Sequence, residues 1–306
     1  MRCPRLVVMR IDQRTYSKIC FGALSLLCVI VVTGAAVRLS GSGLGCHDWP
    51  RCNSEKFIDV SSTHGAIEQV NRLFTGLVAA GVAMAVLGSY RVTPRRRDLV
   101  LLSWSLVAGV LGQVVLGGIV VLTDLHPLAN QGHFVLSMIL VSTATVLWER
   151  SRSERSTAVE PSVSGFHRRW VALCLGLGIA SLMTGTVVTG SGPHAGDEEA
   201  RRFGFDIEWV ARIHGATVIG TLVCLLSLVV IARRSASAWA VLAGPVEALI
   251  AIGVIQATIG YVQYFNGIPA LLVGFHVAGA TAIMIALVRL GYRTFDRPST
   301  DALGPA

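Results

Sequence analysis

Charged residues are scarce in this chain. Asp, Glu, Lys and Arg make up 14% of its 306 residues, whereas soluble domains carry about 25%. Apolar residues make up 53%, and the few charges are clustered, so that long stretches between the clusters hold almost none. This pattern excludes a soluble globular enzyme, a disordered chain and a disulfide-rich secreted module. It indicates a protein that crosses a membrane several times.

The net charge of +8 is carried by basic residues that are spread over many short segments. A nucleic-acid-binding protein gathers such residues into one basic domain or stripe, so we expect no nucleic-acid partner. Membrane lipid is the expected surrounding of this chain.

Apolar runs of about 20 residues are long enough to cross a bilayer, and the chain contains eight. They are predicted at Ile19–Leu39, Ile67–Gly88, Leu99–Leu122, Gly132–Trp148, Trp170–Thr189, Trp209–Ile231, Trp239–Tyr264 and Ala270–Leu290. Each contains Gly, Ala or Ser at close intervals, which lets helix backbones approach in lipid. The predicted fold class is an all-α membrane protein with eight transmembrane helices. Small-residue faces suit packing within one chain and between chains, so a homo-oligomer stays open.

The positions of Lys and Arg predict the orientation, because cytoplasmic loops are enriched in them. Of the 26 basic residues, 19 lie in the two terminal segments and in alternate connections, all on one side. Both termini are therefore predicted to be cytoplasmic, in a multi-pass protein of the plasma membrane. The predicted parts are an N-terminal tail (1–18), a first four-helix half (19–148), a linker (149–169), a second half (170–290) and a C-terminal tail (291–306).

The two halves resemble each other in sequence. The segment Gln113–His133 matches Gln256–His276, with a glutamine, a glycine and a histidine at a common offset of 143 residues. Upstream, TGAAVRLSGSG (Thr33–Gly43) resembles TGTVVTGSG (Thr184–Gly192) at a slightly different offset. We interpret the halves as duplicated, pseudo-symmetric four-helix bundles.

Two histidines of the second half lie at matched depth in separate spans. His214 and His276 lie about five and six residues inside their predicted spans, counted from the outer end, which places both roughly 7–9 Å below the interface. Imidazole pairs across a helical bundle hold haem iron axially, and ionisable residues inside a membrane are usually functional. Subtracting 143 from their numbers gives Asn71 and His133. Neutral histidines bonded to backbone carbonyls, or a zinc site with about four ligands, are the alternatives.

The start of the second span carries polar residues on one helical face. Glu68, Asn71, Arg72 and Thr75 recur at the spacing of that face. Glu68 is interpreted either as a proton-transfer group or as a helix-end carboxylate favoured by the dipole, and Arg72 as a partner of Glu68 or of a haem propionate. His64 lies two turns earlier, about 10 Å away, and is interpreted as an interfacial residue rather than a replacement iron ligand.

Cys46 and Cys52 lie in the first predicted outer loop, with five residues between them. A disulfide is the natural interpretation on an oxidising face, and a reactive dithiol is the alternative. Glu247, in the seventh span, has no evident partner in the sequence. Four cysteines within the spans lack ligand spacing and are interpreted as small core residues: Cys20, Cys28, Cys174 and Cys224.

Several segments, in this order, resemble haem A synthases of the CtaA type, a family of eight-span membrane proteins, over roughly Lys18–Arg293. They are RLSGSGLGCHDWPRCN, IEQVNRLFTG, LGGIVVLTDLHPLANQGH, TGSGPHAGD, ARIHGATV and GFHVAGA. The resemblance implies that the chain oxidises one methyl group of haem O to a formyl group. Two successive hydroxylations and loss of water would give haem A for terminal oxidases.

The resemblance also implies residue roles. The family's second half holds haem b through two histidines, which here are His214 and His276. The family's cysteine pair matches the outer-loop pair described above. The first half is thought to hold the substrate haem, at positions that match Asn71 and His133, and the acidic residue of the family matches Glu68.

Asn71 departs from the family pattern, in which this position is a histidine. Because an amide is a poor iron ligand compared with imidazole, we hypothesise that His133 alone holds the substrate iron. The Asn71 face would then be open to oxygen or water.

Two other functions compete with this one. A di-haem b-type quinol or electron-transfer membrane protein would favour a symmetric set of four histidines, whereas Glu68 and the asymmetric set favour an enzyme. A transporter is the third class, since parallel repeats occur there too. The electron donor, such as a quinol, and the source of the formyl oxygen are not indicated. The resemblance and the apolar farnesyl tail of haem O imply a partner that delivers it, the membrane farnesyltransferase (haem O synthase).

Overall fold

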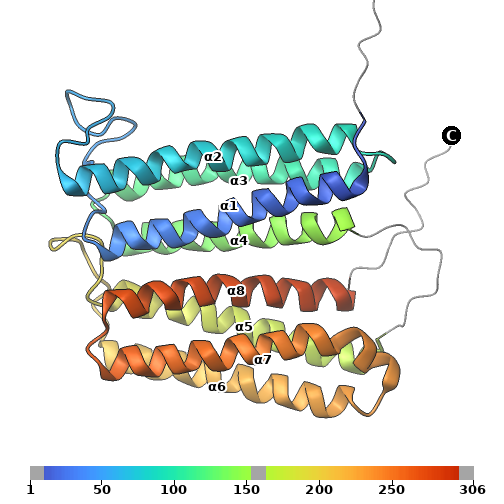
Figure 1. Cartoon of the computed structure of the whole chain (residues 1–306). Helices are drawn as coiled ribbons and strands as arrows, with labels where there is room; N and C mark the ends of the chain where they lie inside the picture. Colours follow the sequence, from blue (N-terminus) through green and yellow to red (C-terminus); the bar gives the residue numbers. More distant parts are fainter. Residues whose placement is uncertain (1–9, 153–162, 296–306) are drawn as a thin grey trace, which may run out of the picture. The chain divides into compact units, whose positions relative to one another are not determined.

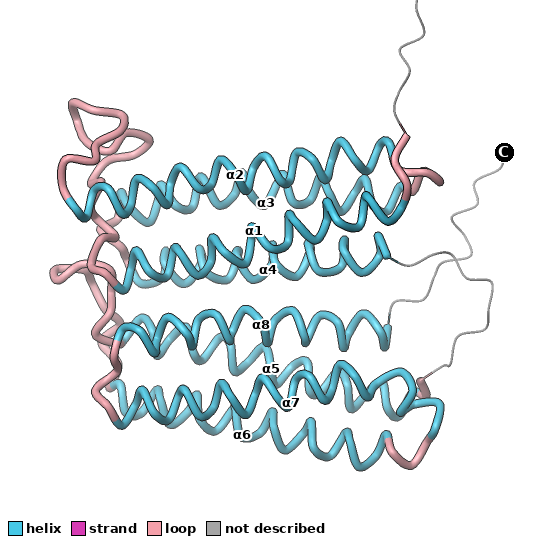
Figure 2. The backbone as a smooth tube through the Cα atoms, viewed as in Figure 1, coloured by secondary structure: helices cyan, strands magenta, loops and turns pink. Residues whose placement is uncertain are grey.

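The computed structural model describes residues 10–152 and 163–295 (Figure 1). Its helices are α1 (Gln13–Leu39), α2 (Thr63–Arg91), α3 (Arg97–Leu122), α4 (Pro127–Arg152), α5 (Gly165–Ser191), α6 (Ile207–Ala232), α7 (Ala236–Phe265) and α8 (Ala270–Phe295). All eight are long and apolar enough to cross a membrane. Within these residues helices are joined by loops, and no named strand occurs (Figure 2). The predicted all-α membrane fold class with eight spans is confirmed.

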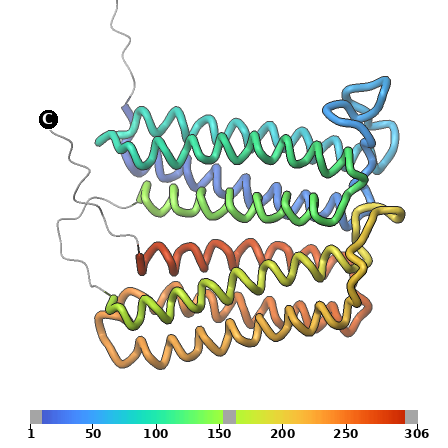
Figure 3. Tube along the Cα trace, turned by 180° about the vertical axis from the view of Figure 1, so that it is seen from behind, coloured from blue at the N-terminus to red at the C-terminus, as the bar shows by residue number. Residues whose placement is uncertain are grey.

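The described residues fall into two compact units. The first contains α1 to α4 with the short segment Gly196–Ala200, and the second contains α5 to α8. In each unit consecutive helices run in opposite directions (Figures 1 and 3). In the first unit α1 packs against α2 and α4, and α3 packs against the same two helices, so α2 and α4 lie on a diagonal. In the second unit α6 and α8 lie on the corresponding diagonal.

Side-chain caps fix where several helices begin. Asp12, Ser62 and Asp206 precede α1, α2 and α6, and each accepts a hydrogen bond from the backbone N–H three residues later. Such caps satisfy donors that the first helical turn leaves unpaired. The cap of α2 places Glu68 and Asn71 in its second and third turns, on the face that the sequence spacing predicted.

The helices reach further into the charged connections than the sequence predicted. The residues after Trp148, which we assigned to the linker from 149 onward, continue α4 to Arg152, so that boundary was placed too early. Arg96 donates a hydrogen bond to the carbonyl of Arg150 at 2.8 Å, and the Arg150 guanidinium lies 3.7 Å from Asp98. The last turn of α4 is therefore satisfied within its own unit. The middle of the predicted linker (153–162), half of the predicted N-terminal tail (1–9) and most of the C-terminal tail (296–306) lie outside the described residues.

The apolar core of the second unit lies away from its histidines. The helices contribute buried residues at the end remote from the α5–α6 loop, among them Val171, Cys174, Leu225, Leu228, Leu242, Val246, Leu287 and Leu290. On α6 and α8 these leucines lie 11 to 14 residues beyond His214 and His276. At Gly178 an added Cβ would stand 2.8 Å from the Leu287 side chain, so the glycine permits close packing of α5 and α8. The core thus holds the helices together and leaves the other end to polar groups.

Candidate functional site

Two imidazoles face each other in the second unit, as their matched depth predicted. His214 of α6 and His276 of α8 have ring centroids 6.3 Å apart and ring planes at 77°. A metal bound by two imidazole nitrogens at about 2 Å each places the centroids roughly 6 Å apart. The separation therefore suits two axial ligands on one haem iron.

A hydroxyl of α5 orients the first of these rings. Thr184 Oγ1 lies 3.2 Å from Nδ1 of His214 and donates its own proton to the carbonyl of Ala180 at 2.9 Å. The same hydroxyl lies 3.0 Å from the carbonyl of Ser181 and 3.1 Å from the hydroxyl of Thr217, so Nδ1 of His214 joins a cluster of hydroxyl and carbonyl groups. Because this contact involves Nδ1, Nε2 is the ring atom that an iron ion would bind.

Each ring of the pair packs against a glycine on a neighbouring helix. An added Cβ would stand 3.1 Å from Cε1 of His214 at Gly185, and 3.2 Å from Cε1 of His276 at Gly260. Both distances are tighter than ordinary contacts, so an alanine at either position would push the ring. The two glycines therefore set how far the imidazoles stand from the helices behind them.

The ligand chemistry agrees with haem better than with zinc. A protein zinc site uses about four ligands from His, Cys or carboxylates. Within residues 10–152 and 163–295 no group of three or more such side chains gathers. The porphyrin of a haem supplies four nitrogen ligands to the iron, so the protein needs to supply only one or two axial side chains.

The first unit repeats one side of this arrangement. Gln113 of α3 donates to the backbone carbonyl of His133 at 3.1 Å, and Gln256 of α7 donates to that of His276 at 2.6 Å. An added Cβ at Gly117 would stand 3.4 Å from Cε1 of His133, as at the equivalent glycine of α7. Residues that share the offset of 143 in sequence therefore make the same contacts in the two units.

Three of the four repeat-related positions carry a buried polar atom that has no hydrogen-bond partner among the described residues. These atoms are Nδ1 of His133, Nδ1 of His276 and Oδ1 of Asn71. An unsatisfied buried polar group costs about 1–3 kcal/mol, so such groups are rare unless a site requires them. The two diagonals are thus the polar interiors of their units.

Glu68 is buried and fully engaged. Its side chain is 8% exposed. Oε2 accepts a hydrogen bond from the backbone N–H of Cys46 at 2.7 Å, and Oε1 accepts two from Arg72, at 2.9 and 2.6 Å. The predicted pairing of Glu68 with Arg72 is present. The carboxylate joins α2 to the cysteine loop.

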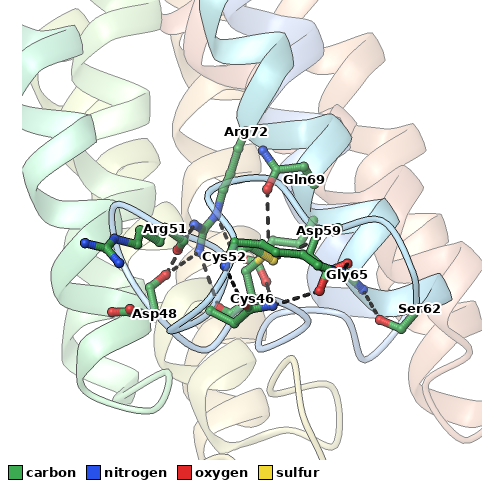
Figure 4. The surroundings of a disulfide bond; sticks show 12 residues. Cys46, Asp48, Arg51, Cys52, Asp59, Ser62, Gly65, Gln69 and Arg72 are labelled. Atoms are coloured by element: carbon green, nitrogen blue, oxygen red, sulfur yellow. Dashed lines mark hydrogen bonds and ion pairs between the residues drawn. A yellow bond between two sulfur atoms is a disulfide. The ribbon is translucent and has the colours of Figure 1, made fainter.

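Arg72 reaches from α2 into the loop. Its Nη atoms donate to the backbone carbonyls of Cys46, Asp48 and Arg51 at 3.1 to 3.3 Å (Figure 4). Its Nε atom donates to Glu68 at 2.9 Å. These acceptors suffice for all five N–H groups of the guanidinium. The alternative partner that the sequence left open, a haem propionate, would have to displace one of these contacts.

The loop between α1 and α2 is closed by a disulfide between Cys46 and Cys52, whose Cα atoms are 4.3 Å apart (Figure 4). The structure contains the disulfide rather than a free dithiol.

Hydrogen bonds from Ser61 and Asn53 to the Asp59 carboxylate hold the pKa of Asp59 below its usual range, and the Lys56 ammonium lies 3.7 Å away. Loop order thus depends on backbone and side-chain bonds that the sequence alone did not indicate.

Other polar residues singled out in the sequence lie apart from these sites. His64 is exposed in the first turn of α2 and its Nδ1 lies 2.8 Å from the Ser42 hydroxyl. Glu247 is exposed on α7. The sequence did not predict that Cys174 of α5 and Cys224 of α6 meet, with sulfur atoms 2.8 Å apart in the core. They are 50 residues apart, and only the packing of two helices brings them together.

Comparison with known proteins identifies relatives of one kind. The family COX15-CtaA, described as cytochrome oxidase assembly protein, matches residues 17–65, which cover α1 and the disulfide loop. Proteins named heme A synthase are similar to the chain, with 31% identity in Bacillus pumilus over 41% of this chain and 43% of the relative, and 29% in Geobacillus thermodenitrificans over 44% and 43%. These matches thus span less than half the length of the curated relatives. A heme A synthase of Shewanella oneidensis is 22% identical over 90% of this chain and 95% of the relative.

Proposed function

We propose that this chain belongs to the COX15-CtaA family of cytochrome oxidase assembly proteins, whose members it resembles, and that it is a membrane oxidoreductase that makes haem A. Its substrate would be haem O, of which one methyl group is oxidised to a formyl group by successive hydroxylation. The product would serve the assembly of terminal oxidases. Eight membrane-spanning helices place this activity in the plasma membrane.

The observation that carries the proposal is the difference between two units with the same helix order. The second unit presents two facing imidazoles with ring centroids 6.3 Å apart. The first unit has His133 at the position equivalent to His276, but an amide, Asn71, at the position equivalent to His214, with the Glu68 carboxylate one turn from the amide. At the positions equivalent to Glu68 and Arg72 the second unit has Ala211 and Gly215. An electron-transfer protein gains nothing from this asymmetry, whereas an enzyme needs one site for the cofactor and another for the substrate.

His214 and His276 would hold haem b as the resident cofactor. Haem b, when bound, supplies one-electron transfer. Thr184 contacts Nδ1 of His214, and Gly185 and Gly260 set the positions of the two rings. These contacts orient the ligands before any haem is present.

His133 and Asn71 would flank the substrate haem in the first unit, with Arg72 and Glu68 at the loop end of the same helix face. Glu68 is the candidate acid–base residue. Because both of its oxygens accept hydrogen bonds from Cys46 or Arg72, it can exchange a proton only when one of these bonds opens. Arg72 in turn can meet a propionate only by releasing a loop carbonyl or Glu68.

The surroundings of the reaction follow from the substrate. The farnesyl tail of haem O is apolar and favours the bilayer, so delivery by the membrane farnesyltransferase that makes haem O suits a multi-pass protein. Electrons would come from a donor such as a quinol. Helix faces with many small residues allow a homo-oligomer.

The proposal is tested by the haem content of the protein purified in detergent. Extracted haem is separated by chromatography beside an optical spectrum, for the natural chain and for His276→Ala. The control is His47→Ala, which removes an exposed imidazole of the first unit.

We expect haem b together with haem O or haem A in the natural chain, and loss of the haem b spectrum in His276→Ala but not in His47→Ala. Haem b alone, even when haem O is supplied, would favour the di-haem electron-transfer alternative. Well-folded protein without haem would overturn both functions.

A further inference from the structure

We propose that the substrate haem of the first unit is bound through His133 on one side only, and that its other side, at Asn71, is an open site for a small uncharged ligand of the dioxygen class. This inference rests on the proposed function. It adds the position at which the second reactant would reach the substrate haem. It concerns two residues of this chain, His133 and Asn71.

The first step is that the His133 side is built like its counterpart in the second unit. A glutamine on the preceding helix donates to the carbonyl of His133, as another does to that of His276. A glycine stands behind each ring, at Gly117 and Gly260. The ligand that remains in the first unit is therefore oriented by the same two contacts as a ligand of the second.

The second step is that the opposite side differs. In the second unit Gly185 of α5 stands behind His214, and the preceding Thr184 bonds to Nδ1 of that ring. The matching residues of α1 are Thr33 and Gly34. An added Cβ at Gly34 would meet nothing within 4 Å, and the Thr33 hydroxyl donates to the carbonyl of Ile30 at 3.4 Å. The glycine of α1 thus borders open space where its counterpart in the second unit contacts an imidazole.

The third step is the chemistry of the amide. Asparagine is a poor iron ligand compared with imidazole, and its side chain ends well short of the position that Nε2 of a histidine would reach. It offers two hydrogen-bond donors and one acceptor, and Oδ1 of Asn71 is buried without a partner among the described residues. An amide beside an open coordination position can hydrogen-bond a small ligand that enters there.

His64 does not fill the position in this structure. It lies seven residues before Asn71 on α2, about two helical turns or 10 Å along the axis, and its Nδ1 lies 2.8 Å from the Ser42 hydroxyl. The nearest histidine on the same helix is therefore engaged elsewhere.

The test uses the full chain carrying haem b and loaded with haem O, and carbon monoxide as the probe. Optical and electron paramagnetic resonance spectra report spin state and ligand binding at each haem without reference to turnover. We expect the ferric protein to show one low-spin and one high-spin haem, and the ferrous protein to bind one carbon monoxide per chain, at haem O.

Three variants identify the residues. Asn71→His should convert the high-spin haem to low spin and abolish carbon monoxide binding, while Asn71→Ala should keep both signals. His64→Ala should change neither. In each variant the unchanged low-spin spectrum of haem b in the second unit reports that the protein is folded.

The outcomes separate this inference from the proposed function. Two low-spin haems that bind no carbon monoxide would overturn the inference and leave the proposed function standing. Carbon monoxide binding that persists unchanged in Asn71→His would also overturn it, because the open side would then lie elsewhere. Failure to bind haem O, with haem b in place, would overturn both.

Discussion

At the scale of single residues, the ion pair between Glu68 and Arg72 is the contact most open to measurement. The Glu68 and Arg72 side chains are 8% and 21% exposed. Removing Arg72 leaves the Glu68 charge and several loop carbonyls without their partner, and removing Glu68 leaves the Arg72 charge and the Cys46 amide without theirs. We expect a double-mutant cycle with Glu68→Gln and Arg72→Met to give a coupling energy of about 1–3 kcal/mol. The measurement is the midpoint of unfolding in mixed detergent micelles.

The chain contains a matched control for this cycle. Glu208 and Arg212 have the same spacing on α6, but their side chains are 62% and 76% exposed. Exposed pairs of this kind contribute about 0.3–0.5 kcal/mol. Equal coupling energies for the two pairs would show that Arg72 does not depend on Glu68 to keep its contacts with the loop.

The glycines behind the proposed haem ligands give a second residue-scale prediction. Gly260→Ala should displace the His276 ring, because the new Cβ would stand 3.2 Å from Cε1. Outer-shell changes at metal ligands typically cost about 10–100-fold in affinity, so we expect haem b retention after gel filtration to fall by about tenfold. Gly244→Ala, also on α7, meets nothing within 4 Å and should retain haem b fully. Equal retention would show that the ring can move aside.

The sequence predicted some of these contacts and missed others for a physical reason. The facing of His214 and His276 followed from their depths, because α-helical rise converts residue number into height. The hydrogen bonds of Arg72 to loop carbonyls depend on the backbone path of residues 46–51, which no periodicity encodes. The meeting of Cys174 with Cys224 depends on the rotation of two helices about their axes, which apolar composition leaves undetermined.

At the scale of elements, helix existence was predictable and helix ends less so. All eight spans stand out because about 20 apolar residues are needed to cross a bilayer. The end of α4 was misplaced, because charge was interpreted as a sign of a linker. Its last turn is instead held by Arg96, which belongs to a different connection and is not recognisable from the local sequence.

The disulfide loop allows a prediction about pH at this scale. The pKa of Asp59 is held below its usual range by hydrogen bonds from Ser61 and Asn53. A group with a depressed folded-state pKa stabilises its surroundings above its unfolded pKa, about 3.9 for Asp, and the effect is lost as pH falls through the folded value. We therefore expect Asp59 to order the loop at pH 6 and to lose this effect only as the pH falls below the usual pKa of Asp, through the lowered folded-state value.

The rate at which a phosphine reduces the Cys46–Cys52 disulfide reports this order. Asp59→Asn should be reduced faster than the natural chain at pH 6, and the ratio of the two rates should fall toward one as the pH is lowered below about 3.9, the usual pKa of Asp. Comparing the two proteins at each pH cancels the pH dependence of the reductant. A ratio that stays constant over this range would show that ionised Asp59 does not order the loop.

At the scale of the whole molecule, the two units share several contacts and differ in their polar side chains. The equivalent contacts of Gln113 and Gln256 with the histidine carbonyls support a common plan for the two units. The cysteine loop and the Glu68–Arg72 pair belong to the first unit alone. Under the proposed function, the second unit would keep haem b and the first would exchange haem O for haem A.

This division predicts that the two haems respond separately to changes in the loop and in the second unit. The backbone of Cys46 donates to Glu68 and accepts from Arg72, so replacing both loop cysteines by serine should loosen the first unit where it binds substrate. We expect retention of haem O to fall on the order of tenfold while haem b stays bound. His276→Ala should give the reverse result, with haem b lost and haem O retained. Haem analysis after gel filtration measures both in one sample, and loss of the two haems together in either variant would show that the units do not bind them independently.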